Sequence, residues 1–139
     1  MIRTTITALA LIALSVPAQA HDENSPHPGF NAHCQVTTSD ASFNGPCDFR
    51  VGRFDGSFSI TSHKPGDRFR RMQILPNIWL ISVTIRENPP GKPAVANVIG
   101  LTSLGISSAW GRAERSPVEP ACWVSVRGED NFKICAWRT

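Results

Sequence analysis

The sequence lacks the features of several common protein classes. Its formal net charge is only +3 over 139 residues, an excess too small to predict a nucleic-acid partner. Its longest apolar run, residues 8–16, is shorter than the roughly 20 residues that span a membrane, so we expect no transmembrane segment. No stretch has the period of an amphipathic helix, and 11 prolines and 10 glycines disfavour long helices. The chain therefore predicts a soluble globular protein with few or no helices.

The N-terminal residues have the form of an export signal. Arg3 supplies an early positive charge, the apolar run follows, and Ala18-Gln19-Ala20 is a small-x-small site that signal peptidase accepts. We therefore expect residues 1–20 to be removed. Residues 21–33 are polar and interrupted by proline, which predicts a flexible tail, and residues 34–139 should form one folded domain. The expected location is the periplasm or the cell exterior.

Four cysteines in a short exported chain predict two disulfide bonds. Cys34 and Cys47 are as far apart in the sequence as Cys122 and Cys135. Zinc sites usually contain Cys-x-x-Cys pairs, which are missing here. We therefore expect the pairs Cys34–Cys47 and Cys122–Cys135.

The second pair lies in a recognisable hairpin. A two-residue turn at Gly128-Glu129 would place Cys122 directly opposite Cys135 and Trp123 opposite Ile134. Opposed cysteines can reach the short Cβ separation that a disulfide requires.

The first pair is less determined by the sequence. A loop at residues 39–41 brings Cys34 close to Cys47, whereas a competing turn at Asn44-Gly45 would carry Cys47 out of reach. In the second case Cys34 would join one of the other two cysteines and tie the two ends of the chain together.

Apolar and polar residues alternate with period two along most of the chain, which predicts half-buried strands. Turn signals recur every 8 to 12 residues, the usual spacing in an all-β sandwich or barrel. We expect a single small antiparallel β-barrel or sandwich of about eight strands. Besides the two strands of the C-terminal hairpin, the segments with strand character are 47–51, 58–61, 72–74, 78–86, 95–101 and 106–110, with Gly111 just beyond the last.

The turn Pro65-Gly66-Asp67 permits two registers. A three-residue loop would place Ile60 opposite Met72 and Phe58 opposite Ile74, so that apolar residues pair. A two-residue loop would place Ile60 opposite an arginine. We predict the first register, because a slip of one residue reverses every side chain.

No residues have the arrangement of a catalytic centre, so we expect a non-enzymatic protein without a cofactor. Gly105-Ile106-Ser107-Ser108 lacks the second glycine of a nucleophile elbow, and no helix follows it. We expect six acidic residues to lie in the tail, in turns or on strand exteriors, where solvated carboxylates are usual: Asp22, Glu23, Asp40, Asp48, Asp55 and Asp67.

The histidines suggest a metal site. Cleavage after Ala20 would make His21 the N-terminal residue, whose amine and imidazole nitrogens suit Cu(II). His27, His33 or His63 could complete the site. Periplasmic copper carriers and secreted copper oxygenases use such an N-terminal histidine, so His21 is a candidate metal ligand by resemblance to them.

Arginine supplies most of the positive charge, and guanidinium groups bind carboxylates and phosphates in a planar, bidentate manner. Arg68, Arg70 and Arg71 cluster, and Arg112 belongs to a second group. These residues could bind an acidic partner, or an anionic lipid or glycan of the envelope. The alternative interpretation is a solvated strand edge that charge protects from pairing.

The four tryptophans are expected first of all in core or hairpin packing. An exposed tryptophan beside arginine could instead anchor a partner, since these residue types dominate binding hot spots. We therefore add Trp110, which is two residues from Arg112, to the candidate binding residues.

Two stretches resemble a group of small uncharacterised exported proteins of Gram-negative bacteria. These proteins share a Gly-Pro-Cys-x-Phe element and an Ala-Cys-Trp to Ile-Cys-Ala ending. The resemblance implies a fold and a compartment and brings no activity. Here the first stretch is Asn44-Gly45-Pro46-Cys47-Asp48-Phe49 with Gly56-Ser57-Phe58-Ser59-Ile60, and the second is Ser108-Ala109-Trp110-Gly111-Arg112-Ala113 with Ala121-Cys122-Trp123 and Ile134-Cys135-Ala136-Trp137.

A second resemblance, at the level of the fold, is to periplasmic inhibitors of c-type lysozyme, which are small disulfide-bonded β-barrels. Their Ser-Gly-x-x-Tyr motif is missing, because the sequence has no tyrosine. Together, the residues predict a monomeric exported binding or structural module whose partner is an envelope or host protein or a glycan. The alternatives are a copper-binding protein that uses His21 and a protein similar to the lysozyme inhibitors.

Overall fold

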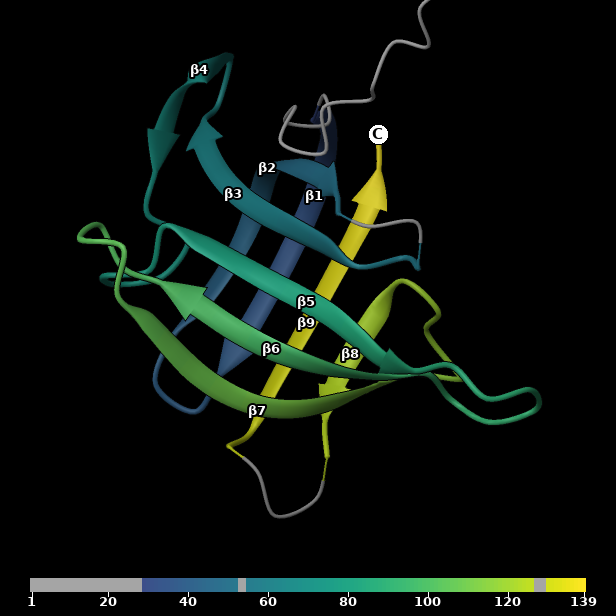
Figure 1. The fold of residues 1–139 in the computed structure, drawn as a ribbon. Helices are drawn as coiled ribbons and strands as arrows, with labels where there is room; N and C mark the ends of the chain where they lie inside the picture. The colour runs from purple at the N-terminus through teal and green to yellow at the C-terminus, as the bar shows by residue number, and fades with distance from the viewer. Residues whose placement is uncertain (1–28, 53–54, 127–129) are drawn as a thin grey trace, which may run out of the picture.

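The computed structural model describes residues 29–52, 55–126 and 130–139. In these ranges the chain forms nine β-strands (Figure 1). No helix in the described ranges is long and apolar enough to cross a membrane. The strands are β1 (Phe30–Thr38), β2 (Ser42–Val51), β3 (Phe58–Lys64), β4 (Asp67–Met72), β5 (Leu80–Glu87), β6 (Val95–Leu101), β7 (Ser107–Arg115), β8 (Cys122–Ser125) and β9 (Phe132–Arg138).

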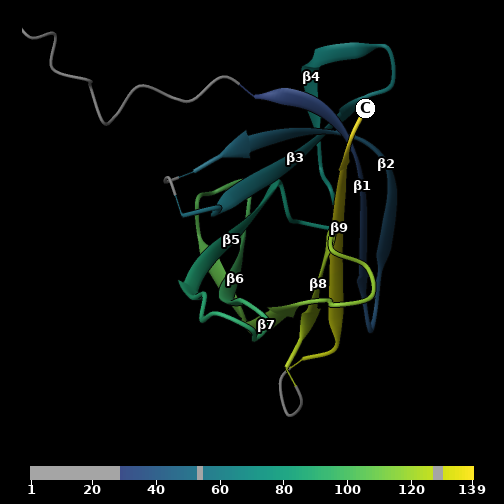
Figure 2. The same ribbon diagram turned by 90° about the vertical axis from the view of Figure 1, so that its right-hand side faces the viewer.

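Eight of these strands close into an antiparallel barrel, which confirms the predicted fold class and selects the barrel over the sandwich. Their order is β2-β1-β9-β8-β7-β6-β5-β3, and pairing between β2 and β3 closes the ring. The extra strand, β4, pairs with β3 and stands at one end of the barrel in both views (Figure 1 and Figure 2). We call residues 64–72, which contain β4, the arm.

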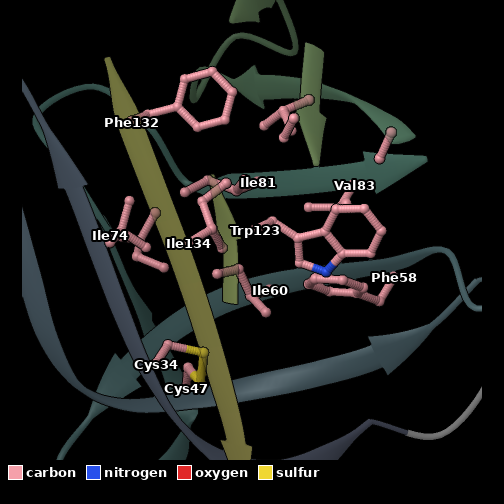
Figure 3. Packing of buried hydrophobic residues seen from close by; sticks show 14 of the residues in the cluster. Cys34, Cys47, Phe58, Ile60, Ile74, Ile81, Val83, Trp123, Phe132 and Ile134 are labelled. Atoms are coloured by element: carbon pink, nitrogen blue, oxygen red, sulfur yellow. A yellow bond between two sulfur atoms is a disulfide. The ribbon is translucent and has the colours of Figure 1, made fainter. Parts of the chain in front are cut away.

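The alternating apolar residues fill the barrel interior, as expected for a small barrel with side chains as its core. The interior side chains come from strands that lie far apart in the sequence, including β1, β3, β5, β6 and β9 (Figure 3). The most completely buried apolar side chains, each less than 2% exposed, include Val36, Ile60, Ile81, Val83, Val98 and Ile134.

Both predicted disulfides are present. Cys122 lies directly opposite Cys135, with a Cα–Cα distance of 4.0 Å, and Trp123 lies opposite Ile134 as predicted. The turn that we expected at Gly128-Glu129 lies outside the described residues.

The disulfide Cys34–Cys47 has a Cα–Cα distance of 5.8 Å and joins β1 to β2 diagonally, because Cys34 pairs with Gly45 and Cys47 with Ala32. The hairpin turn lies at residues 38–41, and the competing turn at Asn44-Gly45 does not form. The Thr38 Oγ1 donates to the carbonyl of Ala41 at 3.1 Å and accepts from its N–H at 3.0 Å.

The register predicted after Pro65-Gly66-Asp67 is wrong. Met72 lies opposite Ser62, and a bulge follows His63, whereas Ile60 lies opposite Ile81 on β5. The chain leaves β4 after Met72, and Ile74 enters the core, where it is 2% exposed. Burial of Ile74 inside the barrel removes more apolar surface from water than a place on the exposed arm would.

The first strand begins at Phe30, so the boundary that we placed between residues 33 and 34 is four residues too late. The ring of Phe30 stacks on Phe49 of β2 with 4.9 Å between ring centroids, and this contact explains why the strand extends toward the N-terminus. Residues 1–28, which include the expected leader and most of the expected tail, lie outside the described residues.

Gly111 lies inside β7 and does not follow it, contrary to expectation. Val98 pairs with Gly111 and Ile99 with Ala109, so Trp110 is the extra residue of a β-bulge. Gly111 has a φ of 109°, which few residues other than glycine adopt. A bulge changes the direction in which the side chain of the inserted residue points, and here the inserted residue is Trp110.

Candidate functional site

The arm carries the most exposed aromatic side chain in the described part of the protein. Every residue of β4 is exposed. The Phe69 side chain is 97% exposed, and Met72 is 44% exposed. Large apolar residues cost free energy when they face water. Two of them beside arginines on one projecting hairpin are therefore candidates for contact with a partner.

Arg68 fastens the arm to the barrel. Its Nη2 and Nε donate to Oδ1 of Asp48 at 2.7 and 3.2 Å, and its Nη2 also donates to the carbonyl oxygen of Gly29. The other Asp48 oxygen, Oδ2, accepts from Nε of Arg50 at 3.4 Å. Arg68 is thus occupied by contacts within the chain, and it is a positioning residue for the arm.

Gly29 leaves the space that the Asp48 carboxylate fills. A Cβ atom at residue 29 would lie 2.5 Å from Oδ2 and 2.8 Å from Cγ of Asp48, closer than real Cβ contacts come. The start of β1, the middle of β2 and the arm therefore meet at this carboxylate.

We expect Asp48→Asn to lower the free energy of unfolding by about 1–2 kcal/mol, because it leaves two guanidinium groups without a carboxylate. It should also speed hydrogen exchange in residues 67–72, since the arm loses its fastening. Urea denaturation and exchange mass spectrometry measure the two effects. Asp67→Asn, on the arm but without an ion pair in the described part of the chain, is the matched control. Equal exchange in the two variants would contradict the fastening role of Asp48.

Three cationic groups on the arm remain available. Lys64, Arg70 and Arg71 are exposed and form no ion pair with any described residue. The nearby Asp67 uses one carboxylate oxygen to accept the backbone N–H of Phe69 at 3.2 Å. The surface around Phe69 is therefore positively charged.

The outer edge of β4 also remains available for pairing. Among the described residues, β4 pairs only with β3, so its second edge presents backbone N–H and C=O groups to solvent. Arg70 and Arg71 could protect this edge from pairing with another strand, as one of the two interpretations of the sequence holds. The exposed Phe69 lies on the same strand.

The structure separates the five predicted binding residues into three places. Arg68, Arg70 and Arg71 lie on the arm, but Arg68 is used by Asp48. Arg112 is exposed on β7, and in the sheet order β6, β5 and β3 lie between β7 and β4. Trp110 is half-buried and lines a cavity of the barrel.

The described histidines do not converge on a metal site. His33 lies on β1 and His63 on β3, with β2 between them. Nε2 of His33 donates to Oδ1 of Asn44 at 2.5 Å. His63 is 8% exposed; its Nδ1 donates to the carbonyl of Lys64 at 3.0 Å. His21 and His27 lie outside the described residues, so the copper site stays a prediction.

Sequence reasoning missed Phe69, Met72 and Trp137. Trp137, on β9, is 39% exposed and is the most exposed of the four tryptophans. Its ring centroid lies 6.1 Å from that of His33. A signal for Phe69 was present, because Arg-Phe-Arg-Arg directly after a Pro-Gly turn places an aromatic residue among charges near a hairpin tip.

No protein-family model, curated protein or solved structure matches the chain. The two resemblances noted from the sequence therefore stay predictions.

Proposed function

We propose that the protein is an exported, non-enzymatic binding module that docks an acidic protein partner through the arm. The observation that carries the proposal is Phe69, which is 97% exposed on a free sheet edge and has an arginine on either side of it in the sequence. The two disulfides support a location outside the cytoplasm, because such bonds persist in oxidising compartments.

The charge of the arm favours an acidic partner. Arg70 and Arg71 present planar guanidinium groups that bind carboxylates through two parallel hydrogen bonds. Positive and negative patches that meet across an interface raise the rate of encounter and exclude partners of like charge. The phenyl ring of Phe69 would supply apolar contact on the same strand.

The arm fits a protein better than a membrane. Its available charges are Lys64, Arg70 and Arg71, opposed by Asp67, whereas lipid-binding segments carry clusters of about 4–8 basic residues. Arginine, phenylalanine and methionine are enriched in protein interfaces. The free edge of β4 can also accept a strand from a partner, a recurrent mode of recognition.

Site-specific photo-crosslinking tests the proposal. A benzoylphenylalanine at position 69 should give one discrete adduct with a protein of the source cells' extracytoplasmic fraction. Reversal of two charges, Arg70→Glu with Arg71→Glu, should reduce the adduct by at least about tenfold, since a tenfold change in affinity needs only 1.4 kcal/mol. The matched control is a benzoylphenylalanine at Val118, another apolar residue that is 87% exposed.

Three results would overturn the proposal. An adduct of equal yield from position 118 would show non-specific contact. An adduct that survives both charge reversals would exclude recognition by the arginines. Binding to vesicles of phosphatidylglycerol, lost in the charge-reversal variant and not seen with phosphatidylcholine, would identify the partner as a membrane surface.

A further inference from the structure

A second candidate site lies in the barrel, away from the arm. Residues at the end of β1, the start of β7 and the start of β9 surround a cavity of about 410 Å³, together with the segment before β5. The arm is fastened near the opposite end of β1, at Gly29. A volume of 410 Å³ falls in the range of roughly 300–1,000 Å³ typical of small-molecule sites.

The apolar wall of this cavity is built around Trp110. The bulge in β7 inserts Trp110, and its ring centroid lies 5.7 Å from that of Phe132 on β9. Gly100 makes room for the indole, because a Cβ there would lie 3.0 Å from the Trp110 Nε1 and 3.1 Å from Cδ1 of Ile78. Leu75 and Ile78 complete the apolar lining.

The charge around the cavity is negative. Asp40, in the turn after β1, and Asp130, before β9, both line it and are exposed. None of the described lining residues is lysine, arginine or histidine. A positively charged group at the opening would therefore meet two carboxylates and an aromatic face.

We propose that this cavity binds small organic amines with an aromatic body, such as arylalkyl ammonium ions. The aromatic body would contact Trp110 and Phe132, since aromatic rings that pack against one another gain more than the burial of their area alone. The ammonium group would lie toward Asp40 and Asp130. Each group of the ligand thus has a counterpart of matching chemistry.

The cavity at the other end of the barrel does not share this character. It is smaller, about 270 Å³, and its lining includes Arg115 as well as Asp55. Nε of Arg115 donates to the carbonyl of Pro120 at 2.8 Å. Positive charge at that opening would oppose an ammonium ion, so the proposal concerns the Trp110 cavity alone.

Titration with phenethylammonium tests the proposal, with chemical shifts of the backbone and indole N–H groups as the readout. We expect saturable shifts at Trp110 and Phe132 and a Kd of about 10 mM or lower, consistent with the affinity per atom of small ligands. Asp40→Asn and Asp130→Asn should each weaken binding about two- to fivefold, as expected for exposed charge pairs. Trp110→Leu should weaken it about tenfold.

Matched controls separate charge from shape. 3-Phenylpropionate has a similar shape and the opposite charge, and should bind at least about tenfold more weakly. Glu114→Gln removes an exposed carboxylate from β7 outside the cavity lining and should leave binding unchanged. Equal binding of 3-phenylpropionate, a loss in Glu114→Gln equal to that in the aspartate variants, or an absence of saturation would each overturn the proposal. The outcome is independent of the arm, since no arm residue lines the cavity.

Discussion

Replacement of both Cys34 and Cys47 by alanine is expected to lower the free energy of unfolding by more than 3 kcal/mol. The chain-entropy model gives about 3 kcal/mol for a loop of this size. A second contribution comes from packing, because both residues are fully buried members of the core cluster, and Figure 3 shows their disulfide among the interior side chains. Removal of the two sulfurs leaves a cavity that the barrel can close only in part. Urea denaturation of the double variant and the wild type, without reductant, measures the loss.

The second disulfide provides a matched control. Cys122 and Cys135 have the same sequence separation of 13 residues as the first pair, so the entropy contribution should be equal. They are buried but do not belong to the core cluster, whereas their neighbours Trp123 and Ile134 do. Their replacement by alanine should therefore cost about 3 kcal/mol and less than the first pair. An equal or larger loss would contradict a packing role for Cys34–Cys47.

The sequence alone predicts the local pairings of the two disulfide-bonded hairpins and leaves the closure of the sheet open. The register of β8 and β9 follows from two cysteines that can meet only when Trp123 faces Ile134. Barrel and sandwich share the same alternation of apolar and polar residues. The distinction depends on β1, which pairs with β2 and also with β9, and on the closing pair β2–β3. The β1–β9 contact joins residues about a hundred positions apart, which local patterns do not encode.

The error at Ile74 has a related cause. Met72 and Ile74 alternate like a strand, but only the completed barrel offers Ile74 a buried position. The same limit applies to the candidate site. Clustering of arginines predicted a basic surface at 68–71, yet the partner of Arg68 is Asp48, 20 positions earlier. Because β2 pairs with β3 and β3 pairs with β4, the folded chain brings Asp48 of β2 close to Arg68 of β4. The sequence does not show this contact, so it cannot tell Arg68 from the arginines that remain available.

Trp123→Ala is expected to lower the free energy of unfolding by about 3–5 kcal/mol, the usual cost of truncating a large buried aromatic residue. The Trp123 side chain is 4% exposed and belongs to the core cluster with Phe58, Val83 and Ile134. It is carried by β8, which has only four residues and contributes no other residue to the core cluster. The loss should therefore appear as reduced stability and as faster hydrogen exchange across β8.

Trp137→Ala, in the same hairpin, is the control that isolates burial. Trp137 is 39% exposed and lies on the opposite face of β9 from Ile134, so its indole packs on the barrel exterior near His33. Because Trp137 lies outside the core cluster, its truncation leaves no cavity in the barrel interior and should cost no more than about 1 kcal/mol. Equal losses in the two tryptophan variants would mean that the inward and outward faces of this hairpin contribute equally to the free energy of unfolding. That result would contradict the assignment of Trp123 to the core, and with it the register that the Cys122–Cys135 disulfide sets.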